Sequence, residues 1–194
     1  ELRLEGGWIW ADLSAIAGSP TAIGRPVGFV RSDGINAVVF KGVPAQGGYL
    51  YELRLEGSWK WSNLSILYGA PAPFSDLSVY VRSDGPATIN YAGADGHIYD
   101  IRYEVSWISA DLTQISGAPT TLSRPSGYVR SDGMNTIVYA TSSTDPGRVI
   151  ELRLDNGWKY YELPSIPGAV RGFMPVGYVR TDGVSTVVYL GTDV

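Results

Sequence analysis

One hexapeptide occurs four times in this chain of 194 residues, once in about every fifty. It reads FVRSDG from residue 29, YVRSDG from residues 80 and 128, and YVRTDG from residue 178. A second motif keeps the same interval, as ELRLEGGW, ELRLEGSW, DIRYEVSW and ELRLDNGW from residues 1, 52, 100 and 151. Two unrelated motifs that repeat in phase indicate four copies of one structural unit, which restricts the fold to a repeat architecture.

The second copy indicates what one unit contains. Residues 78–83 (SVYVRS) and 87–93 (ATINYAG) alternate in the manner of strands, and the Asp-Gly between them is a strong hairpin signal. Two more strands are expected at 97–104 and 107–113, followed by a connection rich in Gly and Pro. Four short antiparallel strands and a long connection are typical of a β-propeller blade, and no helical period is visible.

These patterns predict an all-β fold, a single β-propeller domain of four-stranded antiparallel blades over residues 1–194. The repeats are expected at approximately 1–51, 52–99, 100–150 and 151–194. Because the sequence opens on a third strand and stops after a second, one blade is predicted to be shared between the N- and C-termini. That blade closes the ring without a free edge. We favour a four-bladed ring within one chain; the alternative is a head-to-tail dimer with eight blades.

The aspartate of the hexapeptide is interpreted as a turn residue in every copy. It stands directly before a glycine at Asp33, Asp84, Asp132 and Asp182. Aspartate tolerates the left-handed backbone and accepts hydrogen bonds from amides that follow it. The arginine of the hexapeptide has two open interpretations, a tie between neighbouring blades or a functional group.

Composition excludes several classes of function. The net charge is −4 and no run of basic residues is present, so we expect no nucleic-acid partner. No stretch of 18 apolar residues is present, so we expect no membrane insertion. With no cysteine and a single histidine, we expect neither a metal nor another cofactor. No signal peptide is visible, and the predicted localisation is secreted or extracellular.

Each repeat carries a similar set of acidic, basic and aromatic side chains. The third strand starts with an acidic residue and has an arginine two positions later, on the same side of the strand. The fourth strand starts with a tryptophan, expected to seal the packing between blades, and offers a second aromatic two residues later. The predicted ligand-binding residues are Glu1, Glu52, Glu151, Arg3, Arg54, Arg153, Trp10, Trp61 and Tyr160.

This set of residues suits a sugar. Guanidinium and carboxylate groups hold sugar hydroxyls, while an indole face takes the C–H side of the ring. The alternative is structural, since Glu and Arg two apart on one strand also form ion pairs across a sheet. The third repeat, with Asp100, Tyr103 and Ser109 in place of Glu, Leu and an aromatic, is the copy expected to be defective.

Catalysis is the least supported class of function. Glycoside hydrolysis uses two carboxyl groups in different environments, whereas every acidic position here recurs in near-equivalent surroundings. The single histidine, His97, is interpreted as a turn residue in ADGHIY. We therefore predict no catalytic residue and no enzyme activity. A protein-interaction or purely structural scaffold remains the alternative to ligand binding.

Several segments resemble blades of the bacterial PLL-type β-propeller lectins. They are GYVRSDGMNTIVYA, GADGHIY, ELRLEGSWKW and ADLTQISGAP, and the likeness extends over all four repeats. The resemblance implies a multivalent lectin without catalysis or calcium, which binds fucose- or galactose-type sugars of glycans in clefts between blades. The family's better-studied members have seven blades. The second strands here lack the arginine that Aleuria-type fucose lectins use, so only the glutamate of ELR corresponds.

Overall fold

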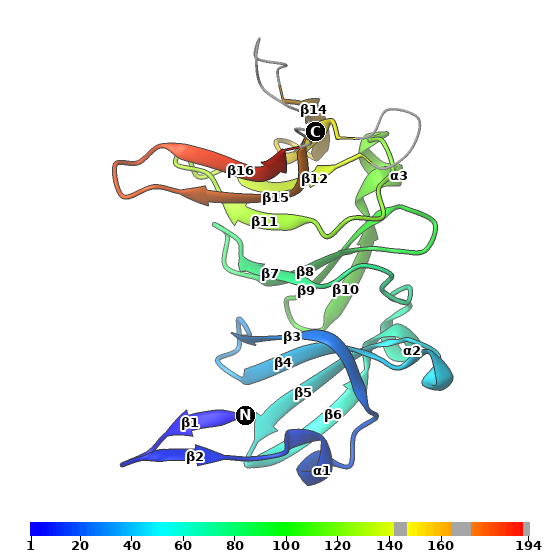
Figure 1. Ribbon diagram of the computed structural model, residues 1–194, viewed down its shortest axis with the longest axis vertical. Coiled ribbons are helices and arrows are strands. Elements are labelled where there is room, and N and C mark those ends of the chain that lie inside the picture. The colour runs from blue at the N-terminus through cyan, green and yellow to red at the C-terminus, as the bar shows by residue number, and fades with distance from the viewer. Residues whose placement is uncertain (142–146, 164–171, 192–194) are drawn as a thin grey trace.

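The computed structural model describes residues 1–141, 147–163 and 172–191. Its described strands form three four-stranded antiparallel sheets and two two-stranded hairpins (Figure 1). The sheets are blade 1, with β3 (Ala22–Val30), β4 (Asn36–Gly42), β5 (Leu50–Glu56) and β6 (Ser58–Asn63); blade 2, with β7 (Ser78–Val81), β8 (Ala87–Ala92), β9 (Ile98–Tyr103) and β10 (Trp107–Asp111); and blade 3, with β11 (Ser126–Val129), β12 (Asn135–Ala140), β13 (Val149–Leu154) and β14 (Trp158–Glu162).

The strands expected for the second repeat are confirmed, with ends that differ by one or two residues. The expectation of no helix is wrong. Each described connection after a fourth strand begins with a one-turn helix: α1 (Leu13–Ala17), α2 (Leu64–Tyr68) and α3 (Leu112–Ser116). A 3-10 turn, η1 (Pro44–Gln46), lies between β4 and β5. The fourth connection, residues 164–171, lies outside the described residues.

Local capping explains these short helices. Asp12, Asn63 and Asp111 are N-caps, and each side chain accepts a hydrogen bond from the backbone N–H three residues later. A glycine in the left-handed region ends each helix, for example Gly117 at φ 69°. One helical turn is too short to show a 3.6-residue period, so the sequence pattern gave no sign of it.

The hexapeptide forms the turn between the first and second strands of each blade. In blade 2, the Gly85 N–H donates to the Arg82 carbonyl at 3.0 Å, and Gly85 has a φ of 108°. The Asp84 carboxylate accepts from the Arg82 Nε at 2.8 Å. The equivalent arginine and aspartate also pair in the other three copies. The aspartate therefore has the structural role predicted for it, and it also holds the arginine.

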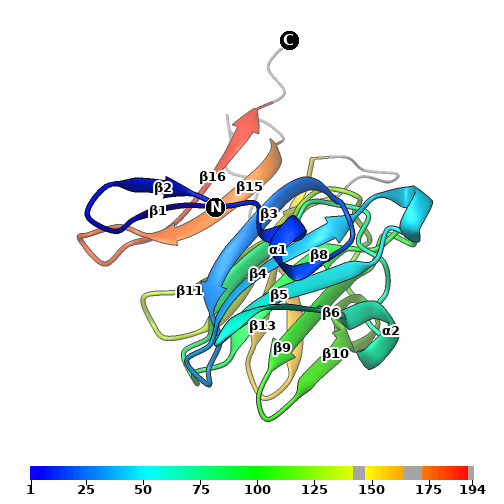
Figure 2. The ribbon, with the colours of Figure 1, turned by 90° about the horizontal axis from the view of Figure 1, so that it is seen from below.

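The blades stack face to face (Figures 1 and 2), and clusters of buried side chains join each blade to the next. Val39 and Leu50 of blade 1 pack with Ile89 and Ile101 of blade 2. A second cluster joins blades 2 and 3 and contains Trp158. Trp107 and Trp158 are buried in these contacts, at 5% and 9% exposure, as expected for the first tryptophan of a repeat.

The chain ends form two further hairpins at opposite ends of the stack (Figure 1). The N-terminal hairpin consists of β1 (Leu2–Leu4) and β2 (Trp8–Trp10), and the C-terminal hairpin of β15 (Gly172–Val179) and β16 (Ser185–Gly191). Each is a separate two-stranded sheet. Joining the two hairpins into one blade within a single chain therefore remains a prediction.

The contact between blades predicts different costs for two tryptophan truncations. Trp107→Ala removes a buried ring that contacts Tyr103 and donates to Glu52, so we expect a loss of about 3–5 kcal/mol in the free energy of unfolding. Trp61→Ala removes a ring that is 39% exposed, and we expect a loss of about 1 kcal/mol. Urea denaturation measures both losses. Equal losses would contradict the placement of Trp107 between blades.

Candidate ligand-binding clefts between blades

Each cleft between blades combines residues from two repeats. Successive residues of a strand point to opposite faces, and residues directly opposite on paired strands share a face. In blade 1, Glu52 lies opposite Ser62, whereas Leu53 lies opposite Trp61. The acid and the arginine of a repeat therefore lie on the face away from its second aromatic. They face the fourth strand of the next blade along the chain.

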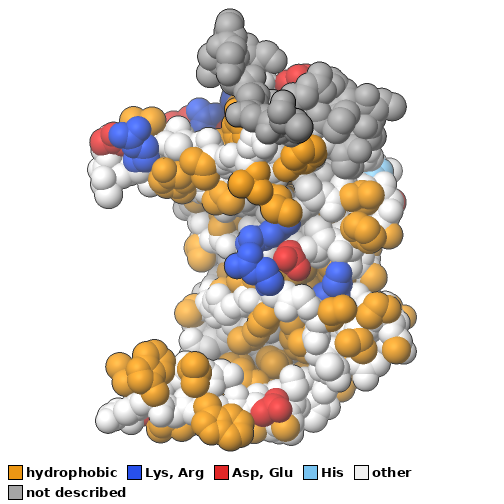
Figure 3. Space-filling view, viewed as in Figure 1, with side chains coloured by type: hydrophobic (Ala, Val, Ile, Leu, Met, Phe, Trp, Pro, Cys, Tyr) orange, Lys and Arg blue, Asp and Glu red, His pale blue; other side chains and the backbone are white. Residues whose placement is uncertain are grey.

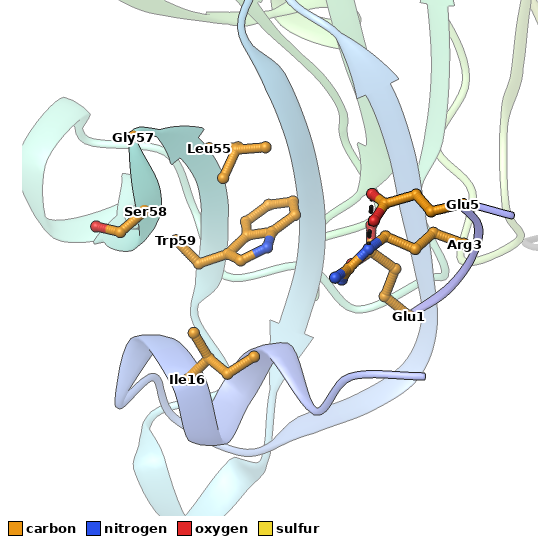
Figure 4. A pocket seen from close by; sticks show the side chains of 8 residues that line it. All are labelled: Glu1, Arg3, Glu5, Ile16, Leu55, Gly57, Ser58 and Trp59. Atoms are coloured by element: carbon orange, nitrogen blue, oxygen red, sulfur yellow. Dashed lines mark hydrogen bonds and ion pairs between the residues drawn. The ribbon is translucent and has the colours of Figure 1, made fainter. Parts of the chain in front are cut away.

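The first cleft lies between the N-terminal hairpin and blade 1, and it contains a pocket of about 410 Å³ (Figure 4). The lining residues are Glu1, Arg3, Glu5, Ile16, Leu55, Gly57, Ser58 and Trp59. Three charged side chains of the hairpin face the indole of Trp59 across this space, and Ile16 of α1 lies to one side (Figure 4). Predicted residues Glu1 and Arg3 are thus brought together with an aromatic ring.

The charged side of this pocket is an ordered group rather than three separate side chains. The Arg3 Nε lies 2.9 Å from the Glu5 Oε1, and the Arg3 Nη1 lies 3.4 Å from the Glu1 Oε2. The Arg3 side chain remains 41% exposed and the Glu5 side chain 62%. Both signs of charge are therefore held in place while open to a ligand.

Trp61 extends the aromatic side of the first cleft. It follows Trp59 by two residues on β6 and therefore lies on the same face. Its ring meets Tyr51 edge-on with a centroid distance of 5.9 Å, which fixes its orientation. At 39% exposure, this predicted residue presents part of its ring to solvent.

The second cleft, between blades 1 and 2, is closed by the predicted residue Glu52. Its Oε1 accepts from the Arg31 Nη1 at 3.0 Å, and its Oε2 lies 3.4 Å from the Trp107 Nε1. Arg54, also predicted, lies 3.8 Å away, and Arg31 stacks 3.7 Å above the Tyr103 ring. Burial raises the pKa of Glu52, and the bond to Arg31 opposes that rise. Arg31 thus ties blade 1 to blade 2.

The third cleft, between blades 2 and 3, holds Asp100 at the position of Glu52. Asp100 is fully buried; the Asn90 Nδ2 donates to it at 3.3 Å, and the Arg102 Nη1 lies 3.6 Å away. Burial raises the pKa of Asp100 to about 6, although Arg102 favours its ionised form. The aromatics of this cleft are Trp158 and the predicted residue Tyr160, which is 43% exposed.

A fourth set of predicted residues is not brought together. Glu151 is buried on blade 3, where Arg153 and Arg130 lie close to its Oε2, the latter at 3.6 Å. The tryptophans that the repeat pattern places opposite, Trp8 and Trp10, lie on the N-terminal hairpin at the other end of the stack (Figure 1). They are 73% and 76% exposed.

The sequence analysis did not identify Glu5 and Trp59 as site residues. Glu5 belongs to a Glu-x-Arg-x-Glu pattern, and its equivalents Glu56 and Glu104 also pair with the arginine two residues earlier, at 3.1 and 2.7 Å. That recurrence was the available signal. Trp59 was predicted to seal a blade contact, and in the first cleft it lines a pocket instead.

The described residues give no sign of two other kinds of site. Among them, no group of three or more His, Cys, Asp or Glu side chains is placed to hold a metal ion. None of the helices in the described ranges has the length and apolar character needed to cross a membrane. His97 precedes β9, and its Nδ1 lies 2.7 Å from the Asp111 carboxylate.

Comparisons with known proteins find distant likeness among solved structures. No family model matches the sequence. No curated protein matches it either. A solved structure of a fucose lectin from Kordia zhangzhouensis, in complex with methyl-fucoside, is similar with a TM-score of 0.48 and 18% sequence identity. The match covers 73% of this chain and 99% of that chain.

The raised pKa of Asp100 predicts a specific pH dependence of stability. Because the folded protein holds this proton more tightly than the unfolded chain does, ionisation of Asp100 between about pH 4 and pH 6 lowers wild-type stability. The Asp100→Asn variant has no ionisable group at this position and therefore does not lose this stability. We expect its free energy of unfolding to rise relative to wild type by roughly 2–3 kcal/mol from pH 4 to pH 7. Denaturation at several pH values tests this, and parallel curves for the two proteins would contradict it.

Proposed function

We propose that this protein is a carbohydrate-binding protein that holds small sugars in the clefts between its blades. The observation that carries the proposal is the first cleft, where Arg3 and two carboxylates face the indole of Trp59 across a pocket of about 410 Å³. The proposal includes no catalytic step.

The two sides of this cleft correspond to the two sides of a sugar ring. Hydroxyl groups both donate and accept hydrogen bonds, so a guanidinium beside carboxylates serves both needs. The C–H face of a pyranose is apolar and packs on an aromatic ring, here Trp59 with Trp61 beside it. Fucose- and galactose-type sugars are the class that the family resemblance implies.

Repetition favours several weak sites over one strong site. The second and third clefts reuse the same plan, with Arg54 facing the Trp107 side and Arg102 facing the Trp158 side. Their acids are more buried than Glu1, so a sugar in the third cleft contacts Arg102 and the exposed Tyr160, whereas the second cleft offers only the buried Trp107. Linked weak sites gain roughly 10² to 10⁴ in apparent strength on a surface that carries many copies of the sugar.

Under this proposal, the third repeat affects two clefts rather than one. Two of its three departures lie on opposite faces of blade 2, because strand alternation turns Ser109 toward blade 1 and the second cleft, and Asp100 toward blade 3 and the third cleft. The second cleft lacks the second aromatic, and the third has a shorter acid. Each of these two clefts is therefore altered on one side only.

The proposal predicts that Trp61→Ala weakens sugar binding. A glycan array at low and high density first identifies the sugar, with binding expected only at high density. Trp61→Ala and Trp59→Ala are then expected to lower the affinity of the first cleft about tenfold, or about 1.4 kcal/mol, in calorimetric titration. Tyr68→Ala is the matched control, since Tyr68 has the same 39% exposure but lies on α2. A blank array at both densities would favour the interaction scaffold.

A second prediction concerns gain of binding. Ser109→Trp places an aromatic ring where the second cleft lacks one, opposite Glu52 and Arg54. We expect the titration to show one more sugar site per chain, with unchanged affinity at the others. Ser106→Trp, an equal addition at the exposed turn between β9 and β10, is expected to add none. Equal stoichiometry for the two variants would contradict the composition of the clefts.

A further inference from the structure

The two terminal hairpins expose apolar side chains whose equivalents are buried elsewhere. On the N-terminal hairpin, Leu2, Leu4, Trp8 and Trp10 are 67–76% exposed (Figure 3). The residues at the positions of Leu2 in blades 1 and 3, Leu53 and Leu152, are 3% and 0% exposed. A contiguous apolar face of this kind marks a surface that another molecule covers.

The C-terminal hairpin shows the same contrast. Val188 of β16 is 49% exposed, whereas its equivalent Val138 in blade 3 is fully buried. Tyr178 of β15 is 43% exposed, and its equivalent Tyr128 is 8% exposed. Among the described strands, β15 is the one partner of β16, so β16 has one edge that no described strand pairs with.

We propose that a second copy of this chain covers both faces, so that two chains close head to tail into one ring. In this assembly, β16 of one copy pairs with β1 of the other, and their two hairpins complete a four-stranded blade. Four observations carry the proposal: strand register, ring packing, polar contacts and the separation of the hairpins.

The register of the missing pair is set by the complete blades. In blade 3, Thr136 lies opposite Arg153 and Val138 opposite Glu151. In blade 1, Ala37 lies opposite Arg54 and Val39 opposite Glu52. The same frame places Thr186 opposite Arg3 and Val188 opposite Glu1. Arg180 then lies near Glu1, as Arg31 lies near Glu52 at 3.0 Å.

A tyrosine ring packs on a glycine of the next inner strand at two contacts, between blades 2 and 3 and between blade 3 and the C-terminal hairpin, whereas blade 2 has Val79 at this position. A Cβ on Gly127 would lie 2.2 Å from the Tyr80 ring, and one on Gly177 would lie 2.1 Å from the Tyr128 ring. Only glycine admits the tyrosine at such sites. Gly28 holds this position in blade 1, yet a Cβ there would meet only the Ala37 carbonyl oxygen, at 4.0 Å, and no aromatic ring. Tyr178, at the other end of the stack, packs on none of these glycines. Gly28 could receive its ring, so the two ends of the stack are complementary in shape at this position.

Hydrogen bonds between the turns of successive blades form a series whose next donor and acceptor stand at opposite ends of the stack. The Ser83 N–H donates to the Asn135 Oδ1 at 2.8 Å, from blade 2 to blade 3. The Ser131 N–H donates to the Ser185 Oγ at 3.0 Å, from blade 3 to the C-terminal hairpin. The next pair in this series joins Thr181 to Asn36, which stand at the two ends of the stack. Asn36 is exposed.

The position of the hairpins indicates a second copy as the occupant. With the contacts between all three blades formed, the two hairpins of one chain still lie at opposite ends of the stack and the surface between them is hollowed (Figures 1 and 3). A head-to-tail contact joins successive molecules and closes when the rotation is complete. Two copies supply eight blades, which is within the usual range of propellers.

This assembly also completes the fourth cleft. Glu151 and Arg153 of one copy then face Trp8 and Trp10 of the second copy, in the arrangement seen in the first cleft. This last step rests on the proposed function, whereas the pairing of the two copies does not.

Molar mass in solution tests the proposal. Light scattering after size exclusion should give twice the chain mass of 20.9 kDa for the wild type. Gly28→Leu adds a side chain where the ring of Tyr178 from a second copy would pack, and its Cβ would lie no closer than 4.0 Å to the Ala37 carbonyl oxygen of its own chain, so we expect a folded protein of single-chain mass. Val188→Asp is expected to do the same. The matched control Val105→Asp, at a turn position 95% exposed, should leave the doubled mass unchanged.

Three results would overturn the assembly. One is a wild type of single-chain mass at every concentration, as closure within one chain requires. Another is a doubled mass that survives both Gly28→Leu and Val188→Asp. The third is a mass that rises without limit. Sugar titration of the same samples separates the two proposals, because a dimer that binds no sugar contradicts only the proposed function, and a monomer that binds sugar contradicts only the assembly.

Discussion

The contact between the face of one blade and the face of the next is the interaction on which the rest of the structure depends. Blade 2 shows why, since Ile101 packs against blade 1 and Ile98 against blade 3, and both are fully buried. A sheet with two apolar faces gains its burial only from neighbours on both sides. Stability is therefore shared along the stack, and a face without a neighbour is exposed apolar surface.

The contact between blades also encloses charged side chains, which restricts the residue types that each blade can have at these positions. Glu52, Asp100 and Glu151 are buried at equivalent positions, and an arginine lies within 3.6 Å of each. A buried carboxylate without a partner is costly, so each acid requires an arginine beside it: Arg31 of the hexapeptide for Glu52, and the third-strand arginine for Asp100 and Glu151. The third-strand arginines keep 22–27% of their side chains exposed, so under the proposed function the groups beside these buried acids also supply polar contacts to a sugar.

Much of this structure follows from the sequence, and the part that does not has a physical reason. The repeat period, the strands of the second repeat and the Asp-Gly turns are local patterns. The helices after Asp12, Asn63 and Asp111 were missed because a single capped turn has no period. The grouping of site residues was also incomplete, because strand alternation separates Glu52 from Trp61 and only the stacking of blades brings an acid near the aromatic of another repeat.

Because each cleft draws on two repeats, the number of complete clefts depends on contacts between blades rather than on the number of repeats. Three contacts supply both an acid with its arginine and a tryptophan strand. At the fourth, Glu151 faces a hairpin that has the inner two strands of a blade and lacks the outer two. Strands β1 and β2 of the N-terminal hairpin correspond to these outer strands, and β2 carries Trp8 and Trp10. In the proposed assembly, they come from a second copy and pair at the open edge of β16. In the proposed assembly, one pair of strands from a second copy covers the exposed apolar faces, pairs with the open edge and completes the fourth cleft.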